Sequence, residues 1–90
     1  MVKDDIGTAI DCNMRIDLTA STVREIHYRK PSGAVGVWTG CTLVGTERIR
    51  RLTIAGDIDE AGAWEFQPYA EKPSWQGWGR MQTVVVEDHI

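Results

Sequence analysis

The sequence has no long hydrophobic run and no excess of basic residues, and each lack excludes a class of protein. No stretch approaches the ~18 apolar residues of a membrane-spanning helix, and the opening residues MVKDDIGTAID lack the charged-then-apolar order of a secretory signal. We therefore expect a soluble protein made in a cytosol, with no membrane partner. The net charge of −3 disfavours nucleic acid as a partner, because phosphate binding needs a basic face.

Cysteine and histidine are both scarce. The two cysteines, Cys12 and Cys41, match no zinc spacing, and the two histidines, His27 and His89, lie far from both in sequence. No Ser/His/Asp or Cys/His arrangement and no Gly-rich phosphate loop indicates an enzyme. We expect free buried thiols, no metal and no cofactor, with a disulfide formed later in an extracellular assembly as the alternative.

Long amphipathic helices are absent from the pattern, because Gly, Pro, Thr and β-branched residues interrupt every helix-friendly window. Short runs of period-two alternation recur instead about every ten residues, which is typical of a β-sandwich or barrel. Ninety residues support one domain, over 1–90, with one core. We predict about seven strands, in the ranges 7–13, 22–30, 34–39, 41–44, 48–54, 63–70 and 80–87.

The alternation also predicts which side chains face the core. In the second run Ile26 and Tyr28 share the inward face, whereas His27 lies among charged residues on the outward face. Trp38 is predicted to lie in the core. In the run 48–54 we expect the core to receive its aliphatic residues, Ile49, Leu52 and Ile54, and solvent to receive its arginines, Arg48, Arg50 and Arg51.

The most distinctive segment is AGDIDEAGAWEFQPYAE, residues 55–71, in which an acidic run leads into alternating aromatics. Asp57, Asp59 and Glu60 suggest a metal loop or a carboxylate pair. A calcium loop also needs a central Gly and a distal Glu at fixed positions, and these are missing. A glycosidase-like pair needs a cleft between its acids, which near neighbours on a turn do not provide. We predict no catalytic residue and no metal here.

The spacing of DEAGAWEF, 59–66, matches the corner through which immunoglobulin-like sandwiches enter their penultimate strand. That corner has the form Asp/Glu-x-Ala-Gly-x-Tyr-x-Cys, with an aromatic that locks the turn and a core residue two positions later. Trp64 and Phe66 take these two positions, and Gly62 permits a positive φ. We predict an immunoglobulin-like β-sandwich in which Asp57 contributes little beyond a turn hydrogen bond.

Four segments resemble small virion proteins of tailed bacteriophages and prophages: DIGTAIDC, YRKPSG, VWTG and, above all, AGDIDEAGAWEFQPYAE. These proteins look like single immunoglobulin-like domains, and the pattern is also similar to the N-terminal domains of some phage baseplate proteins. The resemblance covers most of the chain and weakens at 13–21 and 71–80. It implies a non-enzymatic structural role in the tail, baseplate, neck or capsid surface, with other virion proteins as partners and several copies per particle. It implies synthesis in the host cytoplasm and final location in the virion.

The last strand is the first candidate contact surface. Its unbroken apolar run indicates a strand covered on both faces, and we expect Val84 and Val86 on the face that a monomer would expose. The alternative is that this strand is simply central in its sheet.

The loop 71–79 carries the second candidate, because its Pro and Gly residues exclude a regular strand and it holds Trp75 and Trp78. These indoles, with Arg80 beside them, could cap the sandwich, anchor a protein interface, or stack against sugar rings. A carbohydrate-binding module that aids host adsorption is therefore the alternative function. The protein interface is favoured over sugar, because the loop lacks the Asp, Asn and Gln density that sugar hydroxyls require.

Overall fold

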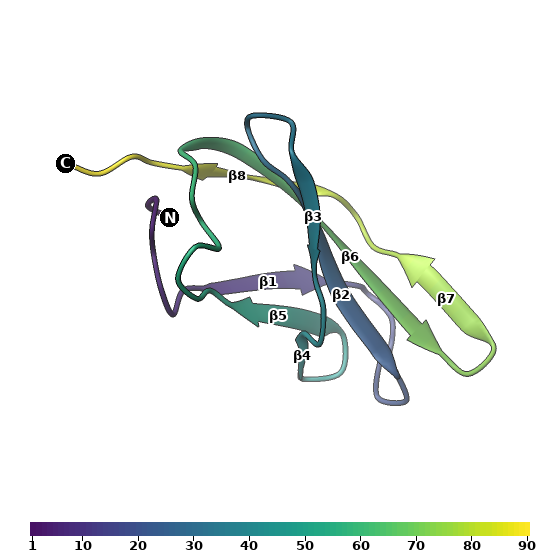
Figure 1. The fold of residues 1–90 in the computed structure, drawn as a ribbon. Coiled ribbons are helices and arrows are strands. Elements are labelled where there is room, and N and C mark those ends of the chain that lie inside the picture. Colours follow the sequence, from purple (N-terminus) through teal and green to yellow (C-terminus); the bar gives the residue numbers. More distant parts are fainter.

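The computed structural model describes all 90 residues and contains only β-strands. Eight strands follow one another along the chain (Figure 1): β1 (Ala9–Asn13), β2 (Val23–Arg29), β3 (Val35–Trp38), β4 (Thr42–Val44), β5 (Arg48–Leu52), β6 (Gly62–Lys72), β7 (Trp75–Trp78) and β8 (Gln82–Val86). No helix is present that could cross a membrane. The predicted all-β class is confirmed, with one strand more than expected.

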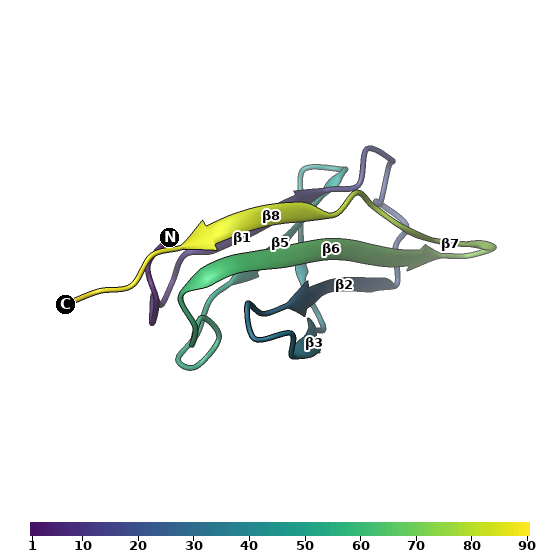
Figure 2. The ribbon, with the colours of Figure 1, turned by 90° about the horizontal axis from the view of Figure 1, so that it is seen from above.

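The strands form two antiparallel sheets. One has three strands in the order β1-β5-β4, and the other has five, in the order β3-β2-β6-β7, with β8 also paired to β6. The long β6 makes this possible, because its first half pairs with β8 and its second half with β7 (Figure 2). A parallel bridge between Val2 and Glu87 brings the two ends of the chain together. The fold is a β-sandwich whose sheets pack face to face.

The core lies between the two sheets and is built around aromatic side chains. Trp64 and Phe66 on β6 are fully buried and stack with centroids 5.9 Å apart, and Trp38 lies 5.6 Å from Phe66. Ile26 is buried from β2, and Tyr28 packs 4.8 Å from Trp38. The predicted inward positions of these five residues are confirmed. Cys12, Leu18 and Ile49 close the core from the smaller sheet and its connections.

Two hairpins show how local sequence fixes the larger sheet. Between β2 and β3, Gly33 takes a φ of 93° and donates to the Lys30 carbonyl at 2.8 Å, while Lys30 donates to the Ala34 carbonyl. Between β6 and β7, Pro73 and Ser74 form the turn, and Ser74 takes a φ of 63°. The residues 75–78 then pair with β6, so the prediction of an irregular loop over 71–79 is wrong. Pro73 and Gly79 lie outside the strand, and only Gly77 falls within it.

The faces of β5 and β8 also differ from the prediction. Leu52 is 56% exposed, whereas Arg51 turns inward and its guanidinium lies 5.4 Å from the Trp38 ring centre. Ile54, beyond the strand end, is exposed as well. In β8, Val86 is 2% exposed and Val84 packs against the core, so the expectation that both face solvent is wrong. Three consecutive valines carry no alternation, and pairing with the inward residues of β6 decides the face.

Candidate functional site

The acidic segment 57–60 makes three separate contacts within the chain rather than one shared site. Asp57 accepts two hydrogen bonds from Arg51, Nε to Oδ2 at 3.0 Å and Nη2 to Oδ1 at 3.1 Å, and a third from the Ile54 backbone. Asp59 pairs with Lys30 at 2.8 Å.

Glu60 completes the set by accepting from the backbone N–H and the hydroxyl of Ser32. The three carboxylates therefore point to different donors, and the segment fastens the β2–β3 turn to the start of β6. This arrangement supports the interpretation of the segment as a structural corner.

Gly62 and Trp64 complete that corner. The φ of Gly62 is 126°, and a Cβ added there would lie 2.8 Å from Cγ of Pro31, so this position needs glycine for two reasons. Trp64 donates from Nε1 to the Glu60 carbonyl at 2.9 Å, four residues upstream. The aromatic residue thus locks the turn, as predicted from the spacing.

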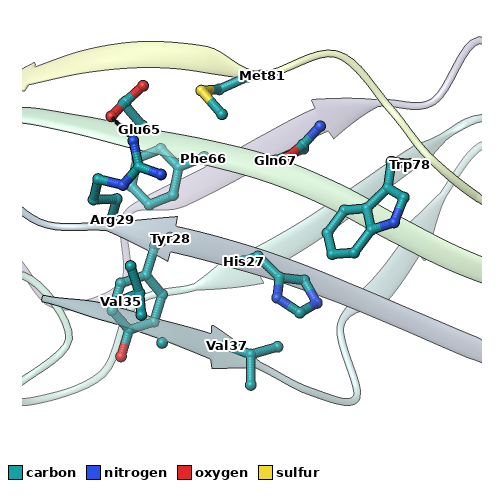
Figure 3. Close-up of a pocket in the computed structure, with 11 residues that line it drawn as sticks. His27, Tyr28, Arg29, Val35, Val37, Glu65, Phe66, Gln67, Trp78 and Met81 are labelled. Carbon is teal, nitrogen blue, oxygen red and sulfur yellow. Dashed lines mark hydrogen bonds and ion pairs between the residues drawn. The ribbon is translucent and has the colours of Figure 1, made fainter.

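The main candidate surface lies on the outward face of the five-stranded sheet. Five of the nine large hydrophobic side chains that are exposed in this chain lie on or beside this sheet: Val35 (72%), Val37 (42%), Trp78 (54%), Met81 (44%) and Val85 (64%). Four of them, all but Val85, border a groove of about 360 Å³. Figure 3 shows its floor, where His27, Gln67 and the Arg29–Glu65 ion pair lie between Val37 on one side and Met81 and Trp78 on the other. We call this surface the outer face.

Three aromatic rings cluster at one end of the outer face. The Trp78 ring lies 4.6 Å from His27 and 4.8 Å from Tyr69, measured between centroids. His27 is held by Glu25 at 3.0 Å from Nε2, and Tyr69 donates its hydroxyl to Glu71 at 2.7 Å. That hydrogen bond raises the pKa of Tyr69, with burial and the charges of the two glutamates adding to it. The rings are therefore fixed by partners while Trp78 stays open to solvent.

The structure separates the two tryptophans that the sequence grouped. They lie three residues apart on β7, so Trp78 faces outward, whereas Trp75 packs against the core cluster beside Lys72. The two indoles therefore do not lie on one face of β7. Arg80 is exposed next to Met81.

The two thiols are free, as expected, and both are buried. Burial raises the pKa of Cys12 to about 12, with Cys41 and Asp11 adding to the shift. The pKa of Cys41 is also raised, chiefly by burial. Both groups are protonated and unreactive in the folded protein.

Comparison with known proteins gave no match, whether to family models, to curated proteins or to solved structures. The outer face is therefore a candidate site on the evidence of its geometry alone. Sequence reasoning placed His27 outward but missed its grouping with Tyr69, Val37 and Met81. The β2–β6 and β6–β7 registers determine which residues of these strands face outward together. No local motif in the sequence predicts those registers.

Proposed function

We propose that this chain is a non-enzymatic assembly module of a tailed-bacteriophage virion, built as an immunoglobulin-like domain and acting through protein contacts on its outer face. The observation that carries the contact role is the concentration of exposed Val35, Val37, Trp78, Met81 and Val85 on one sheet. Large apolar side chains gathered on one face mark an interaction surface, since soluble monomers seldom expose such patches. The location in a virion rests on the sequence resemblance described above.

The strand order supports the immunoglobulin-like assignment. An immunoglobulin sandwich places strands A, B, E and D in one sheet and strands C, F and G in the other, with C′ added in variable domains. Here β1, β5 and β4 follow the order B-E-D, and β3, β2, β6 and β7 follow C′-C-F-G, with β8 continuing G. The hydrogen bond from Trp64 to Glu60 takes the place of the tyrosine corner. Three departures are that no strand A joins β1, that the core tryptophan, Trp38, lies on β3, and that Phe66 stands where a disulfide cysteine is found in antibodies.

Particle composition tests this function. Virions purified from cells that carry the gene are analysed by quantitative mass spectrometry and cross-linking, and we expect the chain in several copies, linked to tail, baseplate, neck or capsid proteins. Trp78→Glu should lose incorporation, whereas Leu52→Glu, a matched exposed site on the other sheet, should keep it. Infectious particles that lack the chain would refute the proposal.

Carbohydrate binding is the second candidate, favoured by the exposed Trp78 ring beside Tyr69, His27 and Gln67. Aromatic faces with nearby hydrogen-bonding groups can hold a sugar ring. A titration of the purified chain with host cell-surface polysaccharide separates the two functions. Saturable quenching of tryptophan fluorescence that disappears in Trp78→Ala would favour the sugar, and an unchanged spectrum would favour the protein contact.

A further inference from the structure

We infer that the partner of the outer face is a second copy of this chain, related by a two-fold axis that lies above the outer face, parallel to the strands and midway between β2 and β6. This inference rests on the function proposed above, because it names the occupant of the same surface. It comes from the register of the sheet and the chemistry of the outward side chains.

The outward residues of β2 and β6 form three cross-strand pairs. Arg29 lies opposite Glu65, His27 opposite Gln67, and Glu25 opposite Tyr69. None of these pairs joins like charges, but within the chain only Arg29 and Glu65 bond to each other: His27 contacts Glu25, and Tyr69 donates to Glu71. The Arg29 Nη1–Glu65 Oε1 distance is 3.0 Å, and both side chains are partly open to solvent, at 55% and 34%.

A two-fold rotation about this axis places β2 of one copy over β6 of the other without changing the rows. Arg29 then faces Glu65 of the second copy, and the reverse contact forms by symmetry. His27 faces Gln67 in the same way, and Glu25 faces Tyr69, whose hydroxyl donates to Glu71 of its own chain. The face is therefore complementary to itself in charge at the Arg29–Glu65 row, as an isologous interface requires.

The apolar residues follow the same symmetry. Val35 and Val37 lie on β3 at one side of the polar rows, and Met81 and Trp78 lie at the other side (Figure 3). Rotation brings Val37 of one copy toward Met81 of the other. Two apolar stripes thus close over a polar centre, and four of the nine exposed large hydrophobic side chains lose their contact with water.

The size of the face is sufficient for a reversible dimer. Four strand positions across and the seven residues of β2 along the sheet span roughly 19 by 23 Å, or at most about 440 Å² in projection, because β3 and β7 have only four residues each. Because side chains project from this plane, two copies together bury on the order of 1,000 Å², the lower bound for a specific interface. Two such sheets stack as in an aligned β-sandwich packing.

Sedimentation equilibrium of the whole chain tests the inference, over about 5 to 500 μM, the range in which weak dimers dissociate. We expect a reversible monomer–dimer equilibrium for the wild type. Arg29→Glu and Glu65→Arg should each weaken it by at least ~10-fold, because each places like charges in contact. An equimolar mixture of the two variants should restore it, since only the mixed pair recovers opposite charges at both crossed contacts. Urea unfolding and near-ultraviolet circular dichroism confirm that each variant is folded.

Two further variants test whether the dimer forms through the outer face. Val37→Glu should also abolish the dimer, and Leu52→Glu on the other sheet should leave it unchanged. A wild type that stays monomeric throughout, or a mixture that fails to restore association, would overturn the inference. If the monomeric chain is still found in virions and Trp78→Glu is not incorporated, the assembly function stands and its partner is a different protein. If the chain dimerises but is absent from virions, the assembly function fails instead.

Discussion

At the scale of single residues, the role of Asp57 depends on Arg51. The sequence predicts Arg51 on the solvent face, but its side chain turns inward. Arg51 turns inward along the Trp38 ring, and Asp57 meets its guanidinium with both oxygens. The Asp57 side chain is only 10% exposed, and that of Arg51 is 23% exposed. Asp57 therefore neutralises a partly buried cation as well as capping a turn, and the small cost expected from the sequence is too low.

Replacement of Asp57 by Ala should lower the free energy of unfolding by about 2 kcal/mol, because Arg51 is left without its partner. Asp59→Ala is the matched control: its carboxylate is 44% exposed and pairs only with Lys30, so a loss below about 0.5 kcal/mol is expected. Urea unfolding followed by tryptophan fluorescence measures both. Equal losses in the two variants would show that the Arg51 pair is not structural.

The Asp11–Arg50 pair should make stability depend on pH. Arg50 donates to both Asp11 oxygens, at 2.7 and 2.9 Å, and this contact lowers the pKa of Asp11 below its ordinary 3.8. A carboxyl with a lowered folded pKa stabilises the fold above its unfolded pKa, and the contribution is lost as the pH falls through the folded value. The difference in unfolding free energy between wild type and Asp11→Asn should therefore be constant at neutral pH and shrink below about pH 4.

Unfolding curves from about pH 7 to about pH 2 measure this difference. Glu47→Gln, at an exposed position on the β4–β5 turn, serves as the control and should change little at any pH. If the difference in unfolding free energy between wild type and Asp11→Asn persists or grows in acid, the Asp11–Arg50 pair is not the source of the pH dependence.

The residue-scale predictions from sequence succeeded where one alternation covered a whole strand. Ile26, Tyr28 and His27 were placed correctly because β2 alternates without interruption. Arg51 was misplaced because charge alone suggested solvent, whereas its long side chain can cover Trp38 and still reach an anion. The partner that makes this favourable lies six residues away in a loop, where no periodic pattern applies.

At the scale of elements, the corner before β6 and the β2–β3 hairpin act as one unit. Pro31 of the hairpin turn lies against Gly62, while Lys30 and Ser32 hold Asp59 and Glu60. In the sequence the two turns are separated by β3, β4 and β5, so their contact is tertiary. The sequence predicted each turn separately but could not predict that they meet.

Gly62→Ala should therefore be much more destabilising than Gly33→Ala. Both glycines have positive φ, but a Cβ at Gly33 meets nothing within 4 Å, whereas one at Gly62 meets Pro31. For Gly33→Ala we expect the free energy of unfolding to fall by about 1–2 kcal/mol, from backbone strain alone. For Gly62→Ala we expect it to fall by about 1–3 kcal/mol more, because the new Cβ meets Pro31.

A double-mutant cycle identifies the source of the difference. Adding Pro31→Gly, which removes the atoms that the new Cβ would meet, should recover the additional loss in Gly62→Ala and none of the loss in Gly33→Ala. Thermal and urea unfolding measure all the variants. A cycle with no coupling between positions 31 and 62 would mean that the two turns do not pack as described.

Elements were hardest to predict where pairing, rather than pattern, decides the structure. The segment 75–78 contains Gly77 and is flanked by Pro73 and Gly79, so its local sequence favours a loop, and only the extended β6 partner makes it a strand. Pairing also determines which residues of β8 face the core, because Val86 pairs with Gly62 and Val84 with Trp64 on the inward side. The outer face depends on both pairings and thus could not be assembled from sequence alone.

At the scale of the whole molecule, one core joins both sheets, and the two thiols lie within it. Cys12 comes from β1 and is 1% exposed, and Cys41 precedes β4 and is 4% exposed. Their burial was predicted because buried free thiols are the default in a cytosolic protein, but their positions followed only from the strand arrangement. Because both thiols are covered by the same core, each should become reactive only when that core opens.

Thiol labelling of single-cysteine variants tests whether the sandwich opens as one unit. With Cys41→Ala only Cys12 remains, and with Cys12→Ala only Cys41 remains. A disulfide reagent at about pH 8 should react with neither thiol on the timescale of an exposed cysteine, because each thiol is buried and the pKa of Cys12 is raised to about 12. In sub-denaturing urea both labelling rates should rise with the slope of global unfolding. A Cys41 rate that is independent of urea would reveal local opening at the β3–β4 connection, where its Sγ donates to the Trp38 carbonyl, and would divide the sandwich into two cooperative units.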